Sequence, residues 1–102
     1  MAKIMVLYRT PKDTAAFDKY YFDKHVPTVK KLPGLRKLEV SQGPVATPAG
    51  PSPFHLIDAL YFDDKAAIQK GYATPEGQAL AADMQNFASG GADVLIFDSR
   101  EV

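Results

Sequence analysis

The side chains best suited to chemistry gather in one aromatic-rich segment, residues 17–27. Phe17, Tyr21 and His25 are spaced by four residues, so a helix places them on one face. An imidazole titrates near neutral pH and can remove a proton from an acidic carbon or a phenol. Neighbouring tyrosine hydroxyls can donate hydrogen bonds to the oxyanion that forms. The segment therefore predicts acid–base chemistry, with His25 and Tyr21 as the catalytic candidates.

Other aromatic side chains are candidates for contacts with a small hydrophobic ligand. They are Tyr8, Phe17, Tyr20, Phe22 and Tyr61. Four aromatic residues fall within six positions of one predicted helix, so they cannot all face the core, and some must meet loops or a pocket. A carboxylate such as Asp23 or Asp58 could orient the imidazole of His25.

A structural interpretation of His25 stays open beside the catalytic one. His25 lies where Pro27 is expected to interrupt the helix, and the helix dipole favours a cation at such a C-terminal end. His55 opens a strand after a proline-rich loop, so we expect an exposed or edge position. Two histidines thirty residues apart without a third ligand do not predict a metal site. Asp63 and Asp64 precede a helix and are expected to cap it.

Composition limits the possible functions. A chain of 102 residues predicts one domain, residues 1–102, and its zero formal net charge argues against a nucleic-acid partner. Without cysteine, disulfides and thiolate chemistry are excluded, which fits a cytoplasmic location. The apolar run Ile4–Leu7 is too short for a membrane span. No G-x-G-x-x-G fingerprint is present, so no nicotinamide or flavin cofactor is expected.

The hydrophobic pattern predicts an α+β domain with the order β-α-β-β-α-β. Expected strands are residues 3–8, 35–42, 54–62 and 94–97. Expected helices are residues 14–24, 27–32, 65–72 and a segment from 75 to the Gly90-Gly91 stop. Residues 43–53 hold four of the eight prolines and read as a loop without packing of its own. This order is typical of the ferredoxin-like fold, a four-stranded antiparallel sheet with both helices on one face.

The third predicted strand suggests that the chain forms a homodimer. Alternation places Phe54, Leu56, Leu60 and Phe62 on one face with Asp58, and His55, Ile57, Ala59 and Tyr61 on the other. Both faces carry apolar bulk, yet the helices can cover only one. A second copy packed sheet against sheet would cover the other face. The charge distribution could favour such pairing: residues 1–50 hold nine Lys/Arg and four Asp/Glu (+5), and residues 51–102 hold three and eight (−5).

A series of short motifs along the chain resembles the EthD family. They are Leu7-Tyr8, Phe17 with Tyr20-Tyr21, His25-Val26-Pro27, Leu32-Pro33-Gly34-Leu35, Tyr61-Phe62-Asp63, Pro75-Glu76-Gly77 and Asn86-Phe87. The resemblance implies a dimeric α+β barrel, and it matches His25 to the histidine that precedes Val-Pro in the family. The family takes its name from a protein needed for ethyl tert-butyl ether degradation, and its members are often labelled oxidoreductases. Relatives in the wider barrel group include cofactor-free monooxygenases, lactone isomerases and polyketide cyclases.

These observations lead to two main functional hypotheses. The first is a cofactor-independent enzyme of oxidoreductase/monooxygenase, isomerase or cyclase type, acting on a small hydrophobic or aromatic metabolite. Its pocket would lie between the sheet and the helices, with His25 as general acid or base. The second is a non-catalytic binding or accessory protein of a degradation pathway, in which the tyrosines recognise the ligand. A homodimer with a purely structural role is a weaker third alternative.

Overall fold

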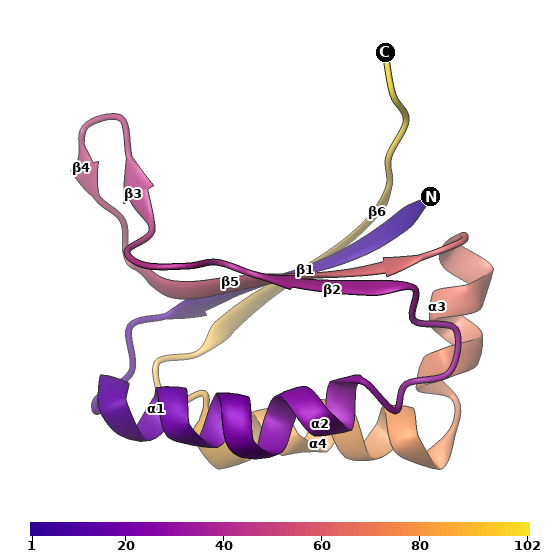
Figure 1. The fold of residues 1–102 in the computed structure, drawn as a ribbon, viewed down its shortest axis with the longest axis horizontal. Coiled ribbons are helices and arrows are strands. Elements are labelled where there is room, and N and C mark those ends of the chain that lie inside the picture. The colour runs from indigo at the N-terminus through magenta and orange to yellow at the C-terminus, as the bar shows by residue number, and fades with distance from the viewer.

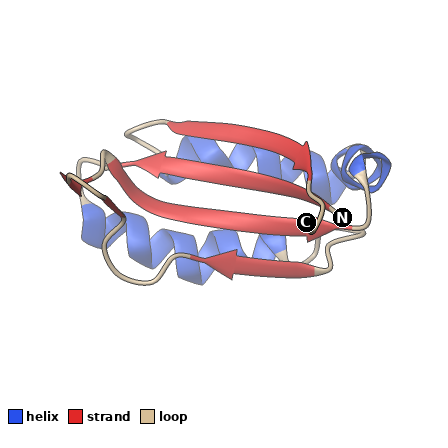
Figure 2. Ribbon diagram, turned by 90° about the horizontal axis from the view of Figure 1, so that it is seen from above, coloured by secondary structure: helices blue, strands red, loops and turns tan.

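The structure, a computed structural model, describes residues 1–102 as an antiparallel sheet covered on one face by helices (Figure 1). The four strands of the sheet are β1 (Ala2–Arg9), β2 (Lys37–Val40), β5 (Phe54–Phe62) and β6 (Ala92–Asp98). Their spatial order is β2-β5-β1-β6, so β5 and β1 are central. The predicted α+β, ferredoxin-like plan is confirmed. Seen from above, the strands lie in front of the helices, and the outer sheet face has no helix over it (Figure 2).

The helical layer consists of two segments with clear start signals. The first contains α1 (Thr14–Tyr20), η1 (Tyr21–His25) and α2 (Val26–Val29), and the second contains α3 (Lys65–Tyr72) and α4 (Pro75–Phe87). Side chains of Asp13, Asp64 and Thr74 accept hydrogen bonds from backbone N–H groups in the first turns of α1, α3 and α4. The expected cap before residue 65 is therefore Asp64. None of these helices combines the length and the apolar character that a membrane span requires.

The expected interruption between residues 24 and 27 is wrong, because the chain stays helical from Thr14 to Val29. The turn η1 is a π-helix, in which the Val26 N–H bonds to the carbonyl of Tyr21, five residues earlier. Pro27, which has no N–H to donate, follows this widened turn at the start of α2. His25 thus lies within a continuous helix and not at its C-terminus, so the helix-cap interpretation is also wrong.

Residues 43–53, expected to form only a loop, contain a small hairpin of β3 (Ala46–Thr47) and β4 (Gly50–Pro51). The Thr47 hydroxyl donates to the Gly50 carbonyl at 3.0 Å, and Gly50 has a φ of +134°, which favours glycine. The hairpin projects from one end of the sheet (Figure 1). The strand expected over residues 35–42 is shorter, and single backbone bonds from Arg36 and Ser41 extend its pairing with β5.

An extra residue in β5 changes the side on which His55 lies. Tyr8 pairs with Leu56 and Arg9 pairs with Phe54, so His55 has no partner in β1 and forms a bulge. Its imidazole ring lies 5.2 Å from the Phe17 ring centroid, and its Nε2 is 2.7 Å from Asp18 Oδ1. Strict alternation assigned His55 to the face away from the helices, and the bulge reverses that assignment.

Close packing against α3 fixes the position of α4, which contributes residues to the candidate site. A Cβ at Gly77 would lie 2.4 Å from the Gly71 carbonyl oxygen and 2.4 Å from Tyr72 Cα. A side chain at Gly77 would therefore push α4 away from α3. This contact sets α4 close beside α3, and Leu80 and Phe87 of α4 are buried in the core.

Candidate functional site

A cavity of about 360 Å³ lies between the sheet and the helices. Twelve of its fifteen lining residues are hydrophobic, and the remaining three are His25, Asp58 and Gln69. Val94 and Ile96 of the edge strand β6 line it and are 54% and 53% exposed, so the cavity reaches solvent beside β6. A mainly apolar pocket with a few convergent polar groups is typical of a small-molecule site.

His25 supplies a buried imidazole to this cavity and is only 3% exposed. Its Nδ1 is 2.8 Å from Asp83 Oδ2, and its Nε2 is 3.5 Å from the Tyr8 hydroxyl. Because an ionised carboxylate only accepts hydrogen bonds, Nδ1 is assigned the proton and Nε2 the lone pair. The Tyr8 hydroxyl also lies 3.3 Å from Met84 Sδ. The long contact to Tyr8 leaves Nε2 accessible to a ligand in the cavity.

Asp83 holds the imidazole in this orientation. Its Oδ1 accepts hydrogen bonds from the Tyr20 hydroxyl at 2.6 Å and from Asn86 Nδ2 at 2.9 Å. Burial disfavours the charged form of Asp83, but the hydrogen bonds from Tyr20, Asn86 and His25 outweigh it and lower the pKa of this carboxyl. Burial also lowers the pKa of His25, against the opposing effect of Asp83. At neutral pH the pair is therefore a neutral imidazole beside a carboxylate.

Asp58 is the second buried polar group in the cavity wall and is 1% exposed. Its Oδ2 accepts a hydrogen bond from the Tyr21 hydroxyl at 2.7 Å, whereas Oδ1 has no hydrogen-bond partner in the protein. Burial raises the pKa of Asp58 to about 7, although the Tyr21 hydrogen bond acts in the opposite direction. Burial likewise raises the pKa of Tyr72, a neighbour in the cavity wall, to about 12.

The structure brings together four of the candidate residues from the sequence. Tyr8 and His25 line the cavity directly. Tyr21 lies behind it, bonded to Asp58, and Tyr20 reaches it through Asp83. Their predicted catalytic and binding roles remain predictions, but these side chains form one connected group.

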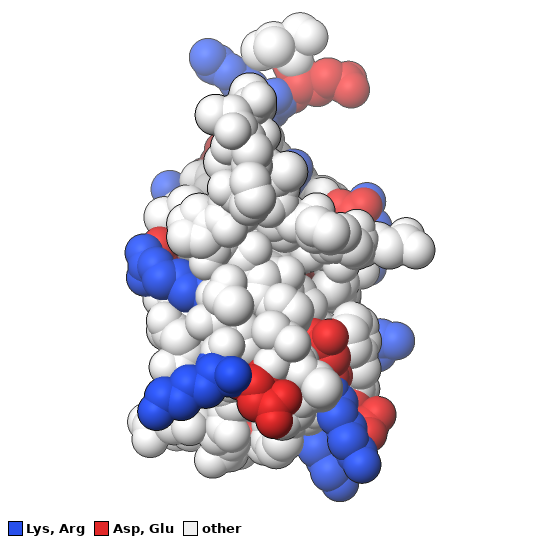
Figure 3. All heavy atoms as spheres, turned by 90° about the vertical axis from the view of Figure 1, so that its left-hand side faces the viewer, with Lys and Arg blue, Asp and Glu red and all other residues white.

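The other three candidates lie outside this cavity. Phe17 is a core residue: its ring stacks on that of Tyr21 with 5.9 Å between centroids, and it meets the Tyr8 ring edge to face at 5.3 Å. Phe22 is 50% exposed and borders a separate, open hollow of about 740 Å³. This hollow lies near the β3–β4 hairpin, and the end of the molecule that carries the hairpin faces the viewer in Figure 3. Tyr61 lies on the opposite face of the sheet.

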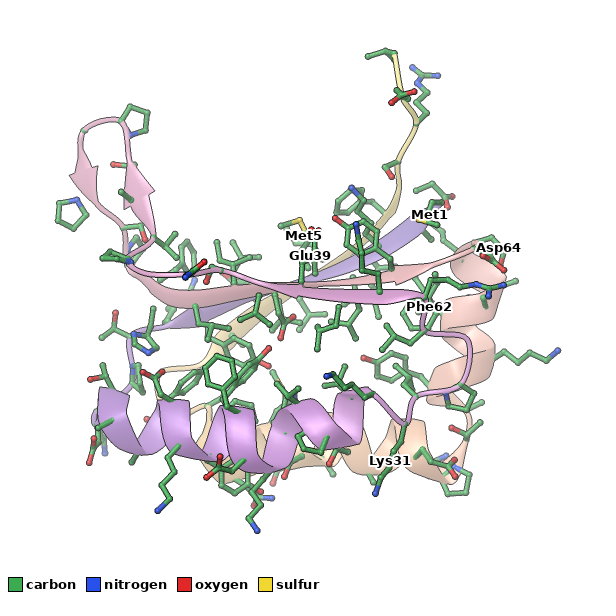
Figure 4. The ribbon with its side chains drawn as sticks, viewed as in Figure 1. Met1, Met5, Lys31, Glu39, Phe62 and Asp64 are labelled. Atoms are coloured by element: carbon green, nitrogen blue, oxygen red, sulfur yellow. The ribbon has the colours of Figure 1, made fainter.

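That opposite face, the open sheet face, combines apolar side chains with an ionic rim. Cross-strand pairing assigns to it Lys3, Met5, Leu7, Lys37, Glu39, Ile57, Ala59, Tyr61, Asp93, Leu95 and Phe97. Met5 and Glu39 point away from the helices (Figure 4). The Tyr61 hydroxyl donates to Glu39, and the ammonium of Lys37 lies 4.4 Å from the Tyr61 ring centroid. Tyr61 is thus part of the outer surface and not of the cavity.

Sequence reasoning missed Asp83 as the residue that orients His25. It proposed Asp23, which is exposed, or Asp58, which bonds to Tyr21. A usable signal was present, since Asp83 stands three residues after Leu80 and four before Phe87, on the apolar face of α4. A carboxylate within such an apolar stripe needs a buried partner, and here the partner is His25.

The family model described as "EthD domain" matches residues 9–91 of the chain. This chain belongs to the EthD family. It is 39% identical over 102 residues to the "Uncharacterized 11.0 kDa protein in thcB-thcC intergenic region" of Rhodococcus erythropolis, covering 100% of this chain and 98% of the relative. A crystal structure of an ethyl tert-butyl ether d (ethd) family protein from Bacillus halodurans C-125 is 37% identical, has a TM-score of 0.90, and covers 98% and 99% of the two chains.

A more distant structure supports the fold alone. SnoaB, described as a cofactor-independent oxygenase from Streptomyces nogalater, superposes with a TM-score of 0.69 at 12% identity, covering 99% of this chain and 94% of SnoaB. The likeness lies in the fold, a sheet with its covering helices. At 12% identity it carries no residue roles.

Proposed function

We propose that this EthD-family chain is a cofactor-independent enzyme that acts on a small hydrophobic or aromatic metabolite, with His25 as general base and acid. The observation that carries the proposal is the buried His25–Asp83 pair, whose Nδ1–Oδ2 distance is 2.8 Å, in the wall of an apolar cavity. A cavity of about 360 Å³ suits a ligand with one or two rings.

The proposed first step is proton transfer to His25. The Nε2 lone pair takes a proton from an acidic carbon or phenol of the ligand, and the bonding electrons stay on the ligand as an enolate or phenolate. The Asp83 carboxylate stabilises the imidazolium that forms, as the carboxylate of a catalytic triad does. His25 then returns the proton at another atom. Oxygenation, isomerisation and ring closure can each begin in this way.

We further propose that the working form is a cytoplasmic homodimer of this single domain. The support is the open sheet face, where Leu95 is 52% exposed beside other apolar side chains. An apolar sheet face of this kind is costly in water, and a second copy would cover it. The helix-covered face, with the cavity, would remain free for the ligand.

Hydrogen–deuterium exchange tests the proton transfer without knowledge of the natural substrate. The probe is phenylacetone, an enolisable aromatic ketone, and its loss of α-protons in deuterium oxide is followed by NMR. His25→Ala should lower the protein-dependent exchange rate by about 10²–10⁴-fold. His55→Ala is the matched control, because His55 also faces a carboxylate, Asp18, at 2.7 Å but does not line the cavity. Unchanged exchange in His25→Ala would remove His25 from the mechanism.

The alternative function is non-catalytic binding of a hydrophobic metabolite, favoured by the predominance of hydrophobic residues in the cavity wall. It predicts saturable binding of phenylacetone, seen as shifts of cavity-residue NMR signals, with no exchange above the rate in protein-free buffer. Binding without exchange would therefore overturn the enzymatic proposal and support the accessory role.

A further inference from the structure

We propose that Asp58 acts in the same cavity as a neutral carboxylic acid whose Oδ1–H donates a hydrogen bond to a carbonyl or enolate oxygen of the ligand. The inference deepens the proposed function and rests on the cavity being the ligand site. It assigns a ligand class: an aromatic or hydrophobic ketone that presents its carbonyl oxygen to Asp58 and an adjacent acidic proton to His25.

The hydrogen bonding of Asp58 is incomplete on one side only. Its Oδ2 accepts from the Tyr21 hydroxyl at 2.7 Å, which fixes the orientation of the carboxyl group. Its Oδ1 has no partner in the protein although the residue is 1% exposed. An unpaired buried polar atom is expensive, and proteins rarely retain one without a reason. Because Asp58 lines the cavity, a ligand atom can satisfy Oδ1.

The surroundings of Asp58 favour its neutral form. The titratable groups that interact with it are Tyr8 of β1, Tyr21 of η1 and Tyr72 of α3. His25 lines the same cavity, and no Lys or Arg does. On β2, the residue paired with it is the apolar Val40. The raised pKa of about 7 agrees with this picture. With Tyr21 donating to Oδ2, the carboxylic proton belongs on Oδ1, where it points to no protein acceptor.

The two buried groups then have opposite roles towards a ketone. His25 Nε2 takes the α-proton as the C–H bond breaks, and the electron pair moves through the carbon–carbon bond to the carbonyl oxygen. Hydrogen bonding from Asp58 Oδ1–H stabilises the negative charge that develops on that oxygen. A carboxylic acid kept neutral by its apolar surroundings can act as such a donor.

Binding of two matched probes tests the role of Asp58. Acetophenone carries a carbonyl oxygen where its near-isostere α-methylstyrene carries a methylene group. The wild type should prefer acetophenone by up to about tenfold at about pH 6, where Asp58 is protonated, and lose this preference at about pH 9. In Asp58→Asn the amide still accepts from Tyr21 and donates into the cavity, so the preference should persist at both pH values.

The outcomes separate this inference from the proposed enzymatic activity. A wild-type preference that does not change with pH, or its loss in Asp58→Asn, would overturn the donor role of Asp58. Comparison with Asp58→Asn also removes the contribution of His25 titration, because His25 is the same in both proteins. Exchange of phenylacetone protons reports on His25 separately, so either result can fail while the other holds.

Discussion

The two faces of β5 show how one strand can serve two different environments. Asp58 and Leu60 face the helices, and both are almost fully buried. Ile57 and Tyr61 alternate with them and lie on the open sheet face, half-buried in a single chain. Polar groups under the helices are few and held by specific hydrogen bonds, whereas those on the open face form an exposed ionic rim. Chemistry is thus expected on the first face and association on the second.

Substitutions at two neighbouring residues of β6 should produce the largest difference between the two faces. Val94 lines the cavity and Leu95 lies on the open sheet face, and their exposed fractions are nearly equal at 54% and 52%. Leu95→Arg should convert a micromolar dimer to monomer, because it places an unpaired charge within an apolar interface. Val94→Arg should remain dimeric and lose affinity for acetophenone. Light scattering measures the mass. A monomeric wild type, or a dimeric Leu95→Arg, would show that the open sheet face is not the dimer interface.

The buried acid predicts a second effect, on the pH dependence of stability. Folding raises the pKa of Asp58 from 3.8 to about 7, so the folded protein binds more protons than the unfolded chain between these values. The free energy of unfolding therefore falls as pH rises through this window. Once the pH is above about 7, the total loss is roughly 4 kcal/mol. Asp58→Asn should remove this loss, so that the variant gains stability relative to wild type as pH rises. Urea denaturation at several pH values measures the free energy of unfolding of both proteins.

His25 gives the opposite dependence and serves as an internal check. Its pKa is lowered in the folded protein, so the unfolded chain binds more protons below its ordinary value of 6.5, and acid destabilises the fold through this group. Asp58→Asn should keep this acid-side loss. An identical pH dependence of the free energy of unfolding in wild type and Asp58→Asn between pH values of about 4 and 8 would contradict the buried, neutral Asp58.

Asp58 and His25 also show how much of the site could be predicted from the sequence. Strand and helix order, the two-sided β5 and the position of His25 on an aromatic helix face all follow from periodicity, which is a local property. Which carboxylate pairs with which side chain could not be assigned in this way, because Asp83 stands fifty-eight residues from its partner His25, and Asp58 stands thirty-seven residues from its partner Tyr21. The π-turn at residues 21–25 and the bulge at His55 are single-residue insertions in regular patterns. Each re-aims an imidazole, and neither leaves a distinctive signal in residue type.

The smallest expected effect comes from matched substitutions of two tyrosines, each of which donates a hydrogen bond to a carboxylate. Tyr21 is buried and donates to Asp58 Oδ2, whereas Tyr61 lies on the open sheet face and donates to Glu39. Tyr21→Phe leaves both oxygens of Asp58 without a partner, so it should cost about 1–3 kcal/mol and raise the pKa of Asp58 further. Tyr61→Phe should produce no resolvable change in the free energy of unfolding, since water replaces its hydrogen bond. Equal losses in the two variants would mean that Tyr61 is as dry as Tyr21, which would place it inside the dimer interface and not on its rim.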